Sequence, residues 1–274
     1  MNLTQTFDWV ESIRPSWQPT AKSYVHLKIN QRHVIKALGD ISIDELTPMS
    51  YVLIQQYALA QGKQTSTANR ITAVLSCAVK ELVKHKKLDA VIPFDMLREP
   101  PGRKEFYSED EIQRLLAACK QLPKDGDVFF DLFFLASKTG ARKGELLKLT
   151  WDCISFEENT LTFYDTKNFD DRTLPLTPEV RGLLKRMYRN RLGDELFEIK
   201  HWQALDTLRK CQAIAGISQK KNFHSYRHSA ATNLFAKGAE LPVIMQVLGH
   251  RSAATSLRYS HATEEGLKKA MATL

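Results

Sequence analysis

Residues 248–261 read Leu-Gly-His-Arg-Ser-Ala-Ala-Thr-Ser-Leu-Arg-Tyr-Ser-His. This stretch follows an apolar, helix-like run that Gly249 brings to a stop, and a second short helical segment then carries Tyr259. His250 and Tyr259 are nine residues apart, too far for one helix face, because side chains meet at spacings of three or four. A turn at Gly249 is expected to fold them back toward one point. A phenol, imidazoles and guanidinium groups suit chemistry on phosphate better than chemistry on a carbonyl group or a sugar.

The composition is that of an ordinary globular protein with a basic surplus. The chain has 274 residues, enough for two compact domains, and 43% of them are hydrophobic. The formal net charge of +8 favours a polyanionic partner such as nucleic acid or an acidic membrane surface, although a basic protein without such a partner has the same composition. The four cysteines form no Cys-x-x-Cys pair and are typical of apolar fillers in a reducing compartment. Because no apolar run approaches the roughly 20 residues that span a bilayer, we expect a cytoplasmic protein.

Residues 1–97 are expected to form a domain that is helical to about residue 95. Apolar spacing predicts helices over residues 23–38, ended by Gly39, over residues 47–62, and from Ser66 or Thr67 onward. The polar positions in and around the third predicted helix include several basic residues. A basic helix face is usually solvated surface, but on a basic chain it is also a candidate for contact with the DNA backbone. Its members are Lys63, Arg70, Lys80, Lys84 and Lys87. Residues 98–104 are expected to be a linker, because two prolines and a glycine cannot continue a helix.

Residues 105–274 are expected to form a second, mostly helical domain. Ser108 and Glu111 have the spacing of a capping box at the start of a helix. Alternation of β-branched and aromatic residues predicts strands at residues 151–156, 160–164 and 172–176, and from residue 177 the chain is expected to be helical with breaks at glycines. The predicted fold class is therefore mainly α, with a small antiparallel β-sheet in the second of two domains.

A second motif covers residues 139–146, which read Thr-Gly-Ala-Arg-Lys-Gly-Glu-Leu. It places Arg142 and Glu145 one helical turn apart, so that the carboxylate can orient the guanidinium. An exposed ion pair on a helix surface has the same spacing, and it is the structural alternative for this motif alone.

A third motif, His-Ser-Tyr-Arg-His, covers residues 224–228 and places His224 and Arg227 on one face of a helix. This pattern also occurs by chance. His224 and His228 have a spacing that could bind zinc, but the metalloprotease pattern requires Glu where Ser225 stands. No metal site is therefore predicted.

Together, the three motifs resemble the catalytic domain of the tyrosine recombinases, the phage integrase family. They occur in the family's order, with the family's nine-residue step from His250 to Tyr259. A further match is Thr166-Lys167-Asn168 in the turn between two strands, where the family carries a catalytic lysine. The resemblance covers residues 105–262, whereas residues 1–97 match the family's helical DNA core-binding domain in size, position and helical character. The arm-binding domain of many phage integrases is not expected here.

The resemblance implies a chemical role for each matching residue. Tyr259 would attack the scissile phosphate and become a 3′-phosphotyrosine, and a phenol with a pKa near 10 needs neighbours that accept its proton. Arg142 and Arg227 would bind the non-bridging oxygens and offset the charge of the transition state. Lys167 would protonate the leaving 5′ oxygen, and His224 would act as general base or proton shuttle.

The remaining residues of the predicted site support these groups. His250 would hydrogen-bond the phosphate. Glu145 would support the residues that contact the phosphate without contacting it itself. Arg251 follows His250 and joins the residues expected to bind DNA. His228 and His261 are expected to orient neighbours or cap a helix rather than take part in the chemistry.

The function that the resemblance implies is site-specific DNA recombination of the integrase type. The partner would be double-stranded DNA, bound by a homotetramer on paired sites that is a monomer when free, with accessory DNA-bending proteins as further partners. Residues 264–274 are a candidate segment for docking on a neighbouring protomer. Because each cleaved bond is stored as phosphotyrosine, no cofactor, nucleotide or metal is expected. The alternatives are a non-cleaving DNA-binding regulator with the same fold and a Xer-like or transposon resolvase.

Overall fold

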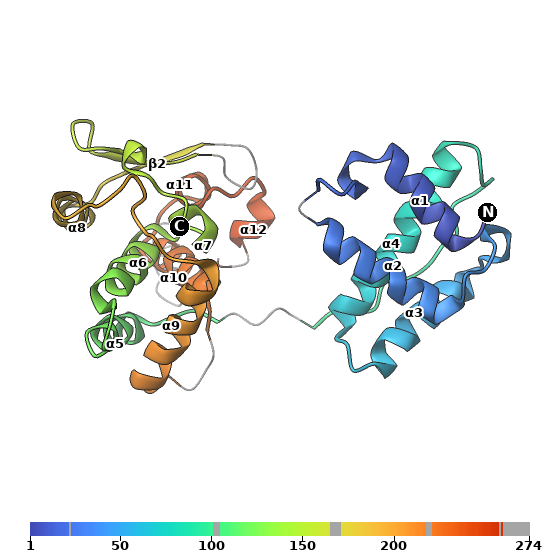
Figure 1. Ribbon diagram of the computed structural model, residues 1–274, viewed down its shortest axis with the longest axis horizontal. Helices are drawn as coiled ribbons and strands as arrows, with labels where there is room; N and C mark the ends of the chain where they lie inside the picture. The colour runs from blue at the N-terminus through green and yellow to red at the C-terminus, as the bar shows by residue number, and fades with distance from the viewer. Residues whose placement is uncertain (22, 101–104, 165–170, 218–220, 258, 260–274) are drawn as a thin grey trace, which may run out of the picture. The chain divides into compact units, whose positions relative to one another are not determined.

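The computed structural model describes the chain except residues 22, 101–104, 165–170, 218–220, 258 and 260–274. The chain divides into two compact units, Met1–Gly102 and Arg103–Leu274 (Figure 1). Both units are mainly helical, and the second also contains a three-stranded antiparallel sheet, so the predicted fold class is confirmed. Among the described residues, no helix has both the length and the apolar character needed to cross a membrane.

The first unit is built from α1 (Leu3–Ile13), α2 (Tyr24–Leu38), α3 (Pro48–Ala60) and α4 (Thr65–Lys84), with 3₁₀ turns at Pro15–Trp17 and Ile43–Glu45. Gly39 ends α2 as predicted, with a positive φ of 78°, and α3 lies within the predicted helix 47–62, with Thr47 as its N-cap residue. The third predicted helix begins at Thr65 rather than at Ser66 or Thr67. Its N-cap residue is Gln64, whose side chain makes no capping bond.

Helix α4 supplies the central face of the first core. Ile71, Leu75, Val79 and Leu82 are fully buried and face α2 and α3. Because burial follows one face of the helix, the opposite face is left to solvent. Arg70, Lys80 and Lys84 lie exposed there.

Residues 85–100 are not helical; for residues 85–95 this corrects the expectation of helix, whereas residues 98–100 were predicted to be non-helical. The chain leaves α4 through Lys86, whose φ is +56°, and then crosses the core in irregular conformation. Phe94 stacks on Tyr51 with ring centroids 4.3 Å apart. The Asn69 side chain accepts a bond from the Leu97 amide and donates one to the Leu97 carbonyl, each at 2.9 Å. These side-chain bonds replace the backbone ladder that a helix would have provided.

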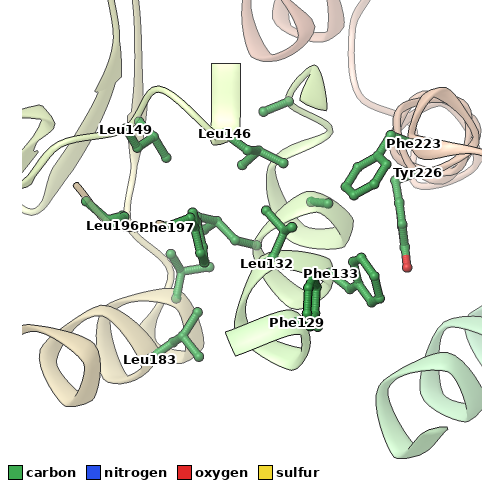
Figure 2. Close-up of a cluster of buried hydrophobic side chains, with 14 of the residues drawn as sticks. Phe129, Leu132, Phe133, Leu146, Leu149, Leu183, Leu196, Phe197, Phe223 and Tyr226 are labelled. Carbon is green, nitrogen blue, oxygen red and sulfur yellow. The ribbon is translucent and has the colours of Figure 1, made fainter. Parts of the chain in front are cut away.

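The core of the second unit forms around α6 (Gly126–Thr139). Helices α5 (Glu109–Cys119), α8 (Pro178–Arg189) and α10 (Phe223–Ala236) pack against it, and α9 (His201–Ile214) packs against α5. Figure 2 shows Phe129 and Phe133 of α6 beside Phe223 and Tyr226 of α10. The capping box predicted at Ser108 is present, since its hydroxyl accepts a bond of 3.2 Å from the Glu111 amide.

The sheet lies beside this core and runs in the order β1 (Ile154–Ser155), β2 (Thr160–Phe163) and β3 (Arg172–Pro175). The first strand is shorter than predicted, because Trp151–Cys153 forms a 3₁₀ turn. Leu161 pairs with Leu174 and Phe163 with Arg172 across the antiparallel register. Side chains alternate along a strand, so Arg172 and Leu174 face the same side, and both are buried.

After α10, two short helices bring the chain back against α10. Helix α11 (Leu241–Leu248) ends at Gly249, whose φ of 63° lies in the left-handed region, and α12 (Ala253–Leu257) follows. Leu248 and Ile244 pack on Ala231 of α10, and Tyr259 lies against this small cluster. The break predicted at Gly249 therefore determines where the last described residues lie.

Candidate active site

Arg142 lies where α6 gives way to the four-residue helix α7 (Lys143–Leu146). Its backbone amide donates to Glu145 Oε2 at 2.9 Å, and its Nη1 donates to Glu145 Oε1 at 2.5 Å. The Glu145 side chain is only 7% exposed, so this pair is not the exposed surface ion pair that the spacing alone allowed. It is a partly buried clamp that fixes the direction of the guanidinium.

Glu145 has a second basic partner that the sequence motifs did not identify. Arg172 Nη2 donates to Glu145 Oε2 at 3.2 Å, and the Arg172 side chain is 4% exposed. Its guanidinium carbon lies 4.5 Å from the centre of the Phe163 ring. Its Nε and Nη1 are buried and have no hydrogen-bond partner in the structure. Burial alone would raise the pKa of Glu145, but the charge of Arg172 and the bonds from Arg142 outweigh it and hold this pKa below its ordinary value.

Arg227 reaches the same place from α10. Its Nη1 donates to the Gly140 carbonyl at 3.1 Å, and its Nη2 donates to the Leu248 carbonyl, so one side chain ties together the ends of α6 and α11. Burial, with the charges of Arg142 and Arg172, lowers the pKa of Arg227 to about 9, which leaves the group charged at neutral pH. Three guanidinium groups therefore gather around the Glu145 carboxylate, and the site has surplus positive charge.

Gly140 makes this convergence sterically possible. Its φ is +59°, and a Cβ atom at this position would lie 2.8 Å from Leu248 Cδ2 and 2.9 Å from Ala230 Cβ. These distances are shorter than carbon atoms tolerate, so the close approach of α6 to α10 and α11 requires glycine.

His250 follows Gly249 and points back into the site. Its Nδ1 and the Ser256 hydroxyl share a hydrogen bond of 2.7 Å, and Ser256 is fully buried. Burial, followed by the charges of Arg227, Arg142 and Arg172, lowers the pKa of His250 to about 4. The imidazole is therefore neutral at physiological pH.

Tyr259 returns to His250 as the sequence predicted. The two rings are nearly parallel, at 15°, with centroids 6.5 Å apart. The Tyr259 hydroxyl shares a hydrogen bond with Nδ1 of His228, and the centroids of the two rings are 5.1 Å apart. The His224 ring lies 6.2 Å from the His228 ring on the same face of α10. The phenol thus lies between imidazoles from two parts of the chain, close to the arginine cluster.

Comparison with known proteins places this geometry in a family. Residues 105–265 match the model of the phage integrase family. The chain belongs to the phage integrase family. Tyrosine recombinase XerA of Saccharolobus solfataricus is 29% identical to it over 194 residues, which are 70% of this chain and 63% of that protein. The chain therefore matches somewhat less than two thirds of the length of this relative.

Solved structures of similar fold include other integrases. The Tn1549 transposon integrase in complex with transposon right end DNA superposes with a TM-score of 0.84, covering 100% of this chain and 99% of that chain at 17% identity. A lambda integrase tetramer bound to a Holliday junction superposes with a TM-score of 0.78, covering 95% and 78% of the two chains at 18% identity. These likenesses show that both units of this family member have the fold of known integrases.

The other residues predicted for the site lie in different places. Lys167 and His261 are outside the described residues, as is the segment 264–274. Arg251 is exposed beside His250. On the first unit, Lys63 is half-buried, and Lys87 Nζ lies 5.1 Å from the Trp9 ring centre. The described residues contain no group of His, Cys, Asp or Glu side chains that could hold a metal ion.

Two residues of the cluster were missed or undervalued by sequence reasoning. Arg172 had one usable signal, because it occupies an inward position in the same alternation as Leu174 and Leu176. His228 is four residues from His224, so the two rings share a helix face, but the motif itself gave no indication of contact with Tyr259.

Proposed function

We propose that this protein is a site-specific DNA recombinase that cleaves and rejoins DNA through a 3′-phosphotyrosine. The observation that carries the proposal is the position of Tyr259. Its hydroxyl meets the His228 imidazole, and it lies near Arg227, which has Arg142 and Arg172 as neighbours. A phenol next to surplus positive charge can attack a phosphodiester, because the guanidinium groups stabilise the charge that develops on the phosphoryl oxygens.

In the proposed reaction, the Tyr259 oxygen forms a bond to the scissile phosphorus as the bond to the 5′ oxygen breaks. Arg142 and Arg227 bind the non-bridging oxygens. Glu145 fixes the Arg142 guanidinium through its bond of 2.5 Å. The leaving 5′ oxygen takes its proton from Lys167. The phenolic proton of Tyr259 leaves through the imidazoles of α10, where His224 is the predicted general base or proton shuttle. The 5′ hydroxyl of another strand reverses the steps and rejoins the DNA.

His250 contributes a neutral donor in this proposal. When the Ser256 hydroxyl donates to Nδ1 across 2.7 Å, the ring proton is on Nε2, which is then free to donate to a phosphate oxygen. The lowered pKa of His250 is consistent with this role, because the ring needs no charge to donate.

The first unit is proposed to bind the DNA backbone through Arg70, Lys80 and Lys84, the exposed basic residues of α4. Assembly is proposed as a tetramer on paired sites, in line with the lambda integrase tetramer on a Holliday junction. A Xer-type resolvase is the second candidate role, favoured by the similarity to XerA. It uses the same chemistry and differs in the DNA sites it joins.

Covalent trapping tests the proposal. The protein is incubated with nicked duplex fragments from its own genomic neighbourhood, in EDTA and without nucleotide, and adducts are separated on a denaturing gel. We expect a protein–DNA adduct that is absent with Tyr259→Phe. Binding to a fragment without an adduct would favour a non-cleaving regulator instead, and dependence on magnesium would also contradict the mechanism.

A further inference from the structure

The His228 side chain contacts the hydroxyl oxygen of Tyr259, which is the reacting atom of the proposed nucleophile. It lies on α10 directly after Arg227 and is half-buried. Its Nδ1 shares a hydrogen bond with the Tyr259 hydroxyl, with the two rings inclined at 42° and their centroids 5.1 Å apart. The sequence predicted that His228 orients neighbours or caps a helix, whereas the structure places its ring nitrogen within hydrogen-bonding distance of the phenol.

The other imidazole next to Tyr259 makes a different kind of contact. His250 lies nearly parallel to the phenol ring, at 15°, and its Nδ1 is engaged by Ser256. Stacking contacts the face of the phenol, not its hydroxyl. Of these two imidazoles, His228 therefore contacts the Tyr259 hydroxyl, and His250 contacts the face of the Tyr259 ring.

The surroundings keep the His228 ring in a form that can accept a proton. Burial, then the neighbouring His224 and then Arg227, lower its pKa below the ordinary value. The ring also faces Tyr259 and His250 from the segment after α11. A neutral imidazole with its proton on Nε2 presents a lone pair on Nδ1, so the phenol donates and the nitrogen accepts.

We propose that His228 is a catalytic residue that takes the phenolic proton of Tyr259 during attack on the phosphate. This inference rests on the proposed recombinase function. The O–H bond of Tyr259 breaks and its proton moves to Nδ1 of His228, while the oxygen's electron pair forms the bond to phosphorus. The bond from phosphorus to the 5′ oxygen breaks, and that oxygen is protonated by the general acid. During rejoining, His228 returns the proton to the departing tyrosine.

Single-turnover cleavage of a nicked substrate as a function of pH tests this role. General base catalysis contributes about 10²- to 10⁴-fold, so His228→Asn is expected to slow cleavage by that factor at neutral pH. The asparagine amide can still hydrogen-bond the phenol but cannot take its proton. The variant's rate should therefore rise about tenfold per pH unit toward the phenol pKa near 10, whereas the wild-type rate stays level above neutral pH.

Controls separate this effect from misfolding and from other steps. His201→Asn changes an exposed imidazole at the start of α9 and is expected to leave the rate and its pH dependence unchanged. Thermal unfolding of His228→Asn checks its fold, and His228→Gln replaces it if the Asn variant unfolds. A substrate with a 5′ thiol leaving group removes the need for a general acid, and on it the His228 variants are expected to stay slow.

Cleavage by a folded His228 variant at the wild-type rate, with the wild-type pH profile, would overturn the proposal. Faster cleavage would also overturn it, because the contact would then hold the tyrosine back. Absence of any adduct with the wild-type protein on DNA that it binds would instead overturn the recombinase function, and the role of His228 with it.

Discussion

At the scale of single residues, the site concentrates positive charge to an extent that costs stability. Arg172 is buried, two of its nitrogens have no partner, and its charge adds to those of Arg142 and Arg227. Buried unpaired donors destabilise a folded protein by about 1–3 kcal/mol each. Buried charged groups with unpaired donors are typical of functional sites that bind a charged ligand. A phosphate diester would supply the negative charge that this cluster of arginines lacks.

Replacement of Arg172 by Met tests its role as a partner of Glu145. It removes unpaired buried donors, but it also takes from the buried Glu145 carboxylate the charge that stabilises it most, and Arg142 remains as its other partner. The free energy of unfolding should therefore fall by about 1–3 kcal/mol. Glu145 loses its bond of 3.2 Å and holds Arg142 less firmly, so cleavage should slow by about 10- to 100-fold. Arg114→Met, at an exposed arginine paired with Asp110, is the matched control for both measurements. Unchanged cleavage in a stable Arg172→Met variant would contradict this positioning role.

The neutral form of His250 predicts how stability changes with pH. The unfolded chain has a histidine pKa near 6.5, whereas the folded value is about 4, so the unfolded state binds more protons between these values. Stability contributed by His250 is therefore present at neutral pH and is lost as pH falls from about 6.5 to 4. We expect a share of about 1–3 kcal/mol, after allowance for partial exposure.

Denaturant unfolding at neutral pH and near pH 4.5 measures this share. His250→Asn should show a smaller loss of unfolding free energy than the wild type between the two conditions. Lowered carboxyl pKa values, as at Glu145, contribute equally to both proteins and cancel in the comparison. An identical loss in both proteins would show that His250 ionises normally in the folded state.

At the scale of elements, the sequence predicted the ends of helices better than the contacts between neighbouring elements. Gly39 and Gly249 end helices because each adopts a positive φ, and that preference is local. The return of Tyr259 to His250 followed from the break at Gly249. Alternation marks Arg172 as an inward position of β3, but its partner depends on how the sheet packs against α7, so the contact with Glu145 could not be predicted. The irregular conformation of residues 85–95 was also not predicted, because this part of the chain is fixed by contacts with distant side chains, such as the stacking of Phe94 on Tyr51.

Gly140 offers a test of how closely the helices must approach. Gly140→Ala combines a left-handed backbone with contacts of 2.8 and 2.9 Å to α11 and α10. We expect the free energy of unfolding to fall by about 1–3 kcal/mol and cleavage to slow, since Arg227 bonds the Gly140 carbonyl. Gly62→Ala shares the positive φ but meets no atom within 4 Å, so it reports the backbone strain alone. Equal effects of the two substitutions would show that packing at Gly140 is loose.

At the scale of the whole molecule, basic residues occur both in the second unit, which carries the candidate site, and on the first unit. The net charge is +8, and α4 exposes Arg70, Lys80 and Lys84 on the face opposite its core residues. The family match covers residues 105–265 of the second unit, whereas the first unit was predicted from its size, position, helical character and charge. Its proposed contact with DNA therefore needs a separate measurement.

The salt dependence of DNA binding provides that measurement. Each phosphate contact contributes about 0.9 to the slope of log affinity against log salt concentration, so Lys80→Ala and Lys84→Ala should each reduce the slope by up to about that amount. Lys185→Ala, at an exposed lysine of α8, serves as the control. Unchanged slopes in the α4 variants would remove this helix face from the interface.

The central claim is that Tyr259 becomes linked to a DNA 3′ phosphate. The most direct test is to trap the adduct on nicked DNA, digest the protein and the DNA, and locate the modified peptide by mass spectrometry. We predict a nucleotide joined through its 3′ phosphate to the peptide that carries Tyr259, and no such peptide from Tyr259→Phe. A linkage at another residue, or through a 5′ phosphate, would contradict the mechanism and the assignment of the site.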